Sequence, residues 1–228
     1  MGPMRPRSSL RRQAAGVALA ALVVPVLAAC SGGSGDDQDP AASSSSPTAV
    51  SSTEAPYLEV PADVALTTRG SQLQVGQPAT VAWQPAADQV GALTITVTKL
   101  EKVPLKALAA WTLTSKTRRS QPYFVRATVR NVGAAALDRV SLPLYAVVGT
   151  DRYVTASSFE TEFKACPSLP LPAKFKPGSS TKLCWVYVAP DHGRLAGVSF
   201  YPGPWFDPIV WKGPIDRYEV PSKKQQKR

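Results

Sequence analysis

The chain of 228 residues contains one histidine, and its surroundings are the first place to look for catalysis. His192 stands in the run Asp191-His192-Gly193, shortly after Pro190. A nucleophilic triad requires a base, an orienting acid and a nucleophile that converge in space. Adjacent residues in a turn do not orient one another in this way. We therefore expect His192 to be an exposed loop residue rather than a catalytic base.

Two other spacings could serve nucleophilic or acid–base chemistry. Ser179 and Lys182 form an S-x-x-K pair, but no S-D-N or K-T-G motif accompanies it. Glu160 and Glu162 would share one face of an extended segment, where paired carboxylates can act as acid and base, although a solvated strand face is the simpler interpretation. One histidine and three cysteines also exclude a His-rich or four-thiolate metal site. The sequence predicts a protein that is not an enzyme and has no cofactor or metal.

The first thirty residues have the pattern of an export signal. Four arginines precede an apolar run over 14–29, which is short for a membrane-spanning helix. The run ends in Leu27-Ala28-Ala29-Cys30, which resembles the lipobox of bacterial lipoproteins. The resemblance implies cleavage before Cys30, a diacylglyceryl and palmitoyl anchor on Cys30, and a location on the outer face of the cytoplasmic membrane. The alternatives are an ordinary cleaved signal with a free cysteine, or an uncleaved anchor.

Composition divides the remaining chain into three parts. Residues 30–56, which begin with Cys30, are rich in Ser, Gly and Pro and lack aromatic residues, so we expect a flexible linker. Residues 57–221 have the composition of a globular domain. Residues 222–228 form a basic tail without an apolar anchor, which predicts disorder. Residues 1–29 would be the lipoprotein signal peptide.

Alternation of apolar and polar residues predicts that the domain is all-β. Over residues 93–98, Leu93, Ile95 and Val97 fall on one face of a strand and threonines on the other. Residues 123–130 and 183–188 are also typical of strands, whereas residues 105–111 are the one fair helix candidate. Pro143 interrupts residues 141–148, which predicts an edge or bent strand there. Short strands without crossover helices favour an antiparallel β-sandwich or barrel.

The cysteine count predicts a disulfide. If Cys30 carries lipid, Cys166 and Cys184 remain as an even number in an exported, oxidising setting. The alternative, a redox pair, lacks the C-x-x-C spacing. The run Lys176-Pro177-Gly178-Ser179, which lies between the two cysteines, predicts a tight turn into the strand that carries Cys184.

Several of these runs resemble a known kind of domain. The strand over 123–130, the turn Asn131-Val132-Gly133 and the run 184–190 are similar to the immunoglobulin-like domains of unknown function in lipoproteins of Gram-positive bacteria. The similarity covers about residues 90–201. It implies an immunoglobulin-like antiparallel β-sandwich outside the cell, with no general enzymatic activity. The Ala- and Pro-rich composition suggests an actinobacterial source.

One aromatic segment could contact a partner. Tyr201, Trp205, Phe206 and Trp211 lie among several prolines, which would limit the entropy that these rings lose on binding. The competing interpretation is that the rings pack back on the sandwich and close its core. Both interpretations stay open at the level of sequence.

Charge supplies the second candidate interaction. The 22 basic and 12 acidic residues of 57–228 give this part a formal charge of +10. Export argues against nucleic acid, so we expect membrane attachment through Cys30 and a partner in the envelope. The leading hypothesis is a membrane-anchored binding or interaction module. The alternative is a structural envelope protein that associates with acidic wall polymers, and a hydrolase or redox enzyme is the weakest of the three.

Overall fold

The structure, a computed structural model, describes residues 57–109, 114–159 and 163–221. The expected signal peptide, Cys30, the linker and the basic tail lie outside the described residues, as do Glu160 and Glu162. Within the described part of the chain, no helix has both the length and the apolar character needed to cross a membrane.

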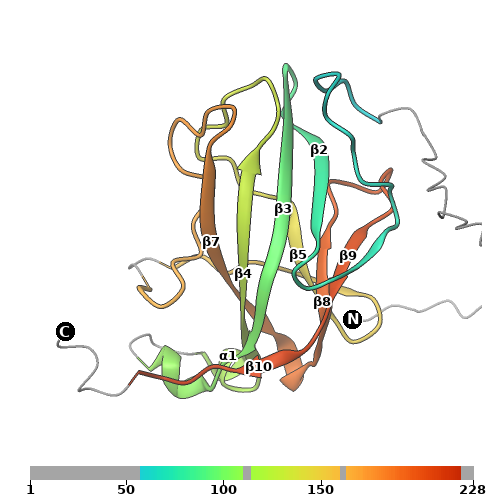
Figure 1. The fold of residues 1–228 in the computed structure, drawn as a ribbon. Coiled ribbons are helices and arrows are strands. Elements are labelled where there is room, and N and C mark those ends of the chain that lie inside the picture. Colours follow the sequence, from blue (N-terminus) through green and yellow to red (C-terminus); the bar gives the residue numbers. More distant parts are fainter. Residues whose placement is uncertain (1–56, 110–113, 160–162, 222–228) are drawn as a thin grey trace, which may run out of the picture. The chain divides into compact units, whose positions relative to one another are not determined.

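Two β-sheets form the domain (Figure 1). One sheet, the β5 sheet, has the order β1 (Gln72–Gln74), β9 (Ile209–Lys212), β8 (Leu195–Phe200), β5 (Leu144–Val148) and β6 (Arg152–Thr155). The other, the β3 sheet, has the order β10 (Ile215–Arg217), β3 (Gln89–Lys102), β4 (Gln121–Asn131) and β7 (Ser180–Ala189), and β2 (Pro78–Ala86) also pairs with β3. The predicted all-β sandwich is confirmed.

The sheets are mixed rather than wholly antiparallel, which corrects one part of the prediction. β1 pairs with β9 in parallel, and β10 pairs with β3 in parallel. One edge of β3 is shared, because β2 covers its first half and β10 pairs with Leu100–Lys102 near its end. Each of these two parallel strands is only three residues long.

The alternation of apolar and polar residues predicted from the sequence matches the observed burial of the strands. Leu93, Ile95 and Val97 of β3 are fully buried between the sheets. The core also contains a chain of edge-to-face aromatic rings, Tyr57–Phe206–Phe200–Trp83, with centroid separations of 5.1, 5.5 and 6.1 Å. Removal of such apolar area from water is the main driving force of folding.

Pro143 ends a loop rather than bending a strand. β5 begins at Leu144 and pairs with β8 on one side and β6 on the other, so the expectation of an edge strand at 141–148 is wrong. Proline cannot donate to a sheet, but here it lies one residue outside the strand and its carbonyl accepts a hydrogen bond from the backbone of Tyr201.

Helical structure is limited to short turns among the described residues. A 3₁₀ helix, η1 (Leu105–Leu108), occupies the start of the predicted helix over 105–111, and residues 110–113 lie outside the described part. One turn of α-helix, α1 (Ser115–Arg118), follows, and the Thr114 hydroxyl caps it by accepting from the backbone N–H of Thr117.

The predicted disulfide is present. Cys166 and Cys184 are bonded, with their Cα atoms 5.0 Å apart. The bond lies in a second, smaller apolar cluster on the outer side of the β3 sheet, where Phe124 of β4 and Val186 of β7 are fully buried. The disulfide therefore ties the segment before β7 onto the outside of the sheet.

Candidate functional site

The aromatic segment after β8 packs mainly into the core. Trp211 and Phe206 are 0% and 2% exposed, so neither can line a surface for a partner. The indole N–H of Trp211 donates to the backbone oxygen of Gln77 at 2.9 Å, which satisfies the ring's polar atom inside the protein. Phe206 and Trp211 must be removed from the candidate binding residues, because β9 buries Trp211 and the turn before β9 packs Phe206 against Tyr57 and Phe200.

The other two candidates of this segment, Trp205 and Tyr201, remain accessible but contact different parts of the domain. Trp205 is 54% exposed and makes an edge contact with the ring of Phe206. Tyr201 is half-buried and packs against Tyr145 and Tyr153 on the β5 sheet. The four residues therefore form no single aromatic patch.

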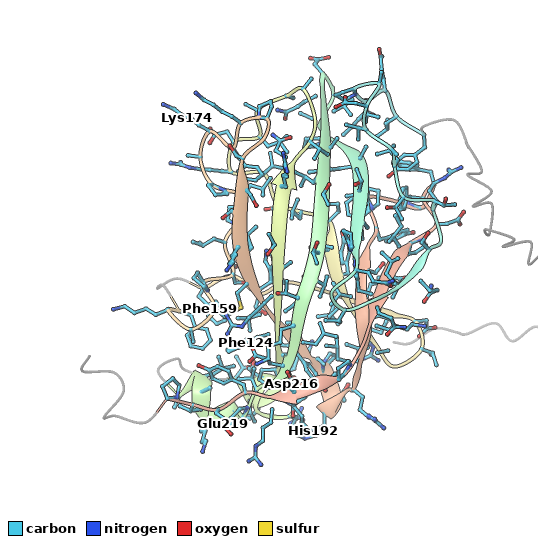
Figure 2. All side chains as sticks on the ribbon, viewed as in Figure 1. Phe124, Phe159, Lys174, His192, Asp216 and Glu219 are labelled. Carbon is cyan, nitrogen blue, oxygen red and sulfur yellow. A yellow bond between two sulfur atoms is a disulfide. The ribbon has the colours of Figure 1, made fainter. Side chains whose placement is uncertain are left out.

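The residues considered for catalysis do not come together. Asp191 and His192 are both exposed and lie in the 3₁₀ turn η2 (Pro190–His192), both with positive φ, as expected for a loop. Figure 2 shows His192 and Asp216 at the same end of the domain and Lys174 toward the opposite end. No group of three metal-ligating side chains occurs among the described residues.

A polar surface on the outer side of the β3 sheet is the best-defined candidate site. We call it the hydroxyl–cation face. It comprises outward residues of β2, β3, β4 and β7, namely Thr80, Thr94, Thr96, Thr128, Arg130, Ser180 and Lys182. These positions alternate with core residues such as Ile95 and Val129, so the same period-two pattern that builds the core places them outside.

Strand register arranges this face in two neighbouring rows. In one row, Arg130 stands opposite Thr94 on β3 and opposite Ser180 on β7. In the next row, Thr128 stands between Thr96 and Lys182. The hydroxyls of Thr80 and Thr94 are 3.1 Å apart and hydrogen-bonded, which fixes one corner of the array.

Two shallow cavities lie along the face. One, of about 390 Å³, is lined by Thr80, Thr94 and Arg130, by the turn at Gly178 and by the segment 63–65, which includes the carboxylate of Asp63. The other, of about 510 Å³, lies beside the disulfide. Its polar lining consists of Thr98, Arg126, Thr128, Lys164 and Lys182. Hydroxyl donors and cations therefore recur along one surface that crosses several strands.

Asn131 and Gly133 hold the end of β4 that presents Arg130. Asn131 is fully buried, its amide donates to the backbone oxygens of Ala135 and Phe175, and its side-chain oxygen accepts from the N–H of Gly133. A Cβ on Gly133 would come within 3.0 Å of the backbone nitrogen of Ala92, so the close approach requires glycine. This is the physical content of the Asn-x-Gly turn.

The predicted turn before β7 closes the same end of the face. The N–H of Ser179 donates to the oxygen of Lys176 at 3.0 Å, and Gly178 has a φ of +78°. Proline followed by a glycine with positive φ is the pattern of a type II turn. The turn leads directly into Ser180, the first residue of β7 and a member of the face.

The opposite end of the face is electrically compensated. Arg126 Nε lies 2.7 Å from Oε2 of Glu101, and Lys99 Nζ lies 2.9 Å from Oε1 and 3.7 Å from Asp216. Burial alone would raise the pKa of the Glu101 carboxyl, but hydrogen bonds from Lys99 and Arg126 outweigh it and hold that pKa below its usual value. By contrast, neither Arg130 nor Lys182 has an ion-pair partner among the described residues.

Sequence reasoning missed this face because its cations are not neighbours in the chain. The basic pair Lys174 and Lys176, which is visible in the sequence, lies in a loop. Arg130 and Lys182 belong to different strands and meet only through the pairing of β4 with β7. The available signal was the polar side of the alternating strands, where threonine and arginine occupy the outward positions.

Comparisons with known proteins add little to this picture. No protein-family model matches the chain, and a search of curated proteins found no match. Among solved structures, the 1.5 Å crystal structure of MPT63, a secreted protein from Mycobacterium tuberculosis, is similar, with 12% identity and a TM-score of 0.43. The match covers 64% of this chain and 99% of that one. A likeness of this extent carries no functional information.

Proposed function

We propose that this protein is a lipid-anchored, extracytoplasmic binding module, and that its hydroxyl–cation face holds an acidic polymer of the cell envelope. The observation that carries the proposal is the placement of Arg130 and Lys182, two cations without ion-pair partners among the described residues, in an array of threonine hydroxyls. Cations attract an oxyanion over distance, and hydroxyls and guanidinium N–H groups then donate hydrogen bonds to it.

The location rests on the N-terminal sequence and on the cysteines. The export pattern and the lipobox-like run at 27–30 support a location outside the cytoplasm on a lipid anchor. The disulfide between Cys166 and Cys184 supports this location, because such bonds persist in oxidising compartments.

A polymer fits the face better than a membrane surface does. Proteins that lie on membranes combine basic residues with apolar side chains that enter the lipid. The exposed large apolar residues of the described chain are Tyr153, Leu169, Trp205, Ile215 and Val220. None belongs to the hydroxyl–cation face, whose contacts would be hydrogen bonds and charge.

The anchor is tested by mass spectrometry of the protein isolated from membranes of its native host. The account predicts an acylated N-terminal peptide that begins at Cys30 and is lost in Cys30→Ser. A native N-terminal peptide without acyl mass would contradict the anchoring half of the proposal while leaving the face untouched.

The face is tested with the predicted mature chain, residues 30–228 carrying Cys30→Ser, in binding measurements on defined polymers. We expect binding to poly(glycerol phosphate) and to polygalacturonate that weakens as salt rises, and no binding to neutral dextran. Equal retention on dextran, or binding confined to phosphatidylglycerol vesicles, would contradict the assignment to an acidic polymer.

A further inference from the structure

A separate cavity of about 360 Å³ opens where the edges of the two sheets meet. Strands β5 and β7 and the segments 155–158 and 168–170 line it. β6 is the last strand of the β5 sheet and β7 the last strand of the β3 sheet, so the cavity occupies the open side of the sandwich. Its volume falls within the range of about 300–1,000 Å³ that is usual for small-molecule sites.

Hydrogen bonds between the two edges hold the walls of the cavity in place. The N–H of Ser157 donates to the oxygen of Val186 at 2.7 Å, and the hydroxyl of Ser168 donates to the oxygen of Ser157 at 2.6 Å. The same hydroxyl accepts from the N–H of Val186 at 3.2 Å. The segment that follows β6 is thus joined to β7.

Trp185 supplies an unused hydrogen-bond donor in the wall. Its side chain lines the cavity and is only 5% exposed, and its indole N–H has no hydrogen-bond partner among the described residues. Among the described residues, Ser199 Oγ is the one side-chain nitrogen or oxygen atom that is both fully enclosed and without a hydrogen-bond partner. The indole nitrogen of Trp185 also lacks a partner, so it is not fully enclosed and keeps some access to solvent. A nearly buried donor that faces no protein acceptor is available to a ligand.

The chemistry of the described lining favours a neutral ligand. No Asp, Glu, Lys, Arg or His is among the described residues that line the cavity. An ion placed there would lose its hydration without gaining a counter-charge. The polar lining consists instead of hydroxyl groups, which both donate and accept hydrogen bonds, while Leu142, Leu169 and Pro170 supply apolar surface.

We propose that this cavity binds a neutral sugar, a monosaccharide or one unit of a chain. A sugar has hydroxyls that both donate and accept, and apolar C–H faces, which match the serine and threonine hydroxyls and the leucine and proline surface. The indole N–H of Trp185 donates to a ring or hydroxyl oxygen of the sugar, and Leu169, 55% exposed at the cavity, covers an apolar face. The site is distinct from the hydroxyl–cation face and does not depend on its function.

The experiment is a titration of ¹⁵N-labelled mature chain, with Cys30→Ser, followed through the tryptophan indole signals. The probes are glucose, galactose, N-acetylglucosamine, trehalose and cellobiose. Trp185→Phe assigns the Trp185 signal by its disappearance. The account predicts a saturable shift of that signal with at least one of these sugars.

Variants separate the cavity from general effects on the protein. Trp185→Phe should lower the affinity for the sugar by about 5–10-fold, the usual loss for one hydrogen bond. Leu169→Ala alters an exposed side chain, so the domain should fold normally and bind about 3–5-fold more weakly, which keeps the test valid if Trp185→Phe is unstable. Ile215→Ala, at a residue exposed to 39% on β10, is the control and should bind like the parent chain.

Three results would overturn the proposal. No shift of the Trp185 signal with any sugar at its solubility limit is the first. Binding that Leu169→Ala and Ile215→Ala weaken equally is the second. The third is occupation of the cavity by a neutral fatty alcohol or a peptide while every sugar is without effect.

Discussion

The Nε atom of Arg126 lies 2.7 Å from Oε2 of Glu101, and this contact joins β4 to β3 beside the hydroxyl–cation face. The Glu101 side chain is only 6% exposed and also binds Lys99. Arg126 adds a contact over the ring of Phe124, 5.8 Å from its centroid. One carboxylate thus compensates two cations where the open, positive part of the sheet meets the apolar cluster around the disulfide.

Replacing this carboxylate should destabilise the domain. Glu101→Gln leaves Arg126 and Lys99 without their counter-charge, and we expect a loss of about 2–3 kcal/mol in the free energy of unfolding, since both cations keep partial access to water. Urea denaturation measures it. Glu219→Gln, at an exposed carboxyl, is the control and should change stability by less than about 0.5 kcal/mol. Equal stabilities of the two variants would show that the buried pair contributes nothing.

The same group gives a pH dependence. The pKa of Glu101 is lower in the folded chain than its usual value, so the unfolded chain binds more protons in the acid range. The free energy of unfolding therefore decreases as the pH is lowered through that range. The contribution is complete above the unfolded pKa of about 4.3 and is lost as pH falls through the folded pKa. Between about pH 6 and 3, the stability of Glu101→Gln should fall less steeply than that of the parent. Parallel curves would refute the assignment.

The disulfide should contribute mainly to stability. Replacing both Cys166 and Cys184 by Ser removes a link that closes a short loop, which corresponds to about 3 kcal/mol on the chain-entropy model. For a domain of this size, Tm should fall by about 6–12 °C. Calorimetry of the double variant measures this, and an unchanged Tm would mean that the apolar cluster alone holds the segment before β7.

Two tryptophans of one segment should behave in opposite ways. Trp211→Ala removes a fully buried ring and leaves a cavity, which should cost about 3–5 kcal/mol. Trp205→Ala changes a ring that is 54% exposed and should cost no more than about 0.5–1 kcal/mol. Chemical denaturation of both proteins measures the difference. Similar losses would contradict the inward orientation of β9.

The sequence predicted the features that depend on local periodicity. The alternation of Leu93, Ile95 and Val97 with threonines fixes which side of β3 is buried, because successive side chains of a strand point to opposite faces. The Pro177-Gly178 turn also follows from neighbouring residue types, and the cysteine pairing follows from the number of cysteines.

Features that depend on distant pairing were beyond the sequence. The parallel pairing of β1 and β10 involves three-residue strands whose partners lie far along the chain. Trp205 and Trp211 occur in similar surroundings in the sequence, but Trp211 belongs to β9 and pairs with Val198 of β8, whereas Trp205 lies in the loop before that strand. For the same reason, Arg130 and Lys182 were not recognisable as neighbours.

The most direct test of the proposed function is the affinity of the mature chain for poly(glycerol phosphate) at several salt concentrations. Arg130→Ala/Lys182→Ala should bind about 10–30-fold more weakly, at roughly 1 kcal/mol for each cation, with a shallower dependence on salt. The charge-matched control is Arg194→Ala/Lys212→Ala, because Lys212 lies on β9 of the other sheet and Arg194 just precedes β8. It should retain most of the affinity. Equal weakening in the two double variants would contradict a specific role for the hydroxyl–cation face.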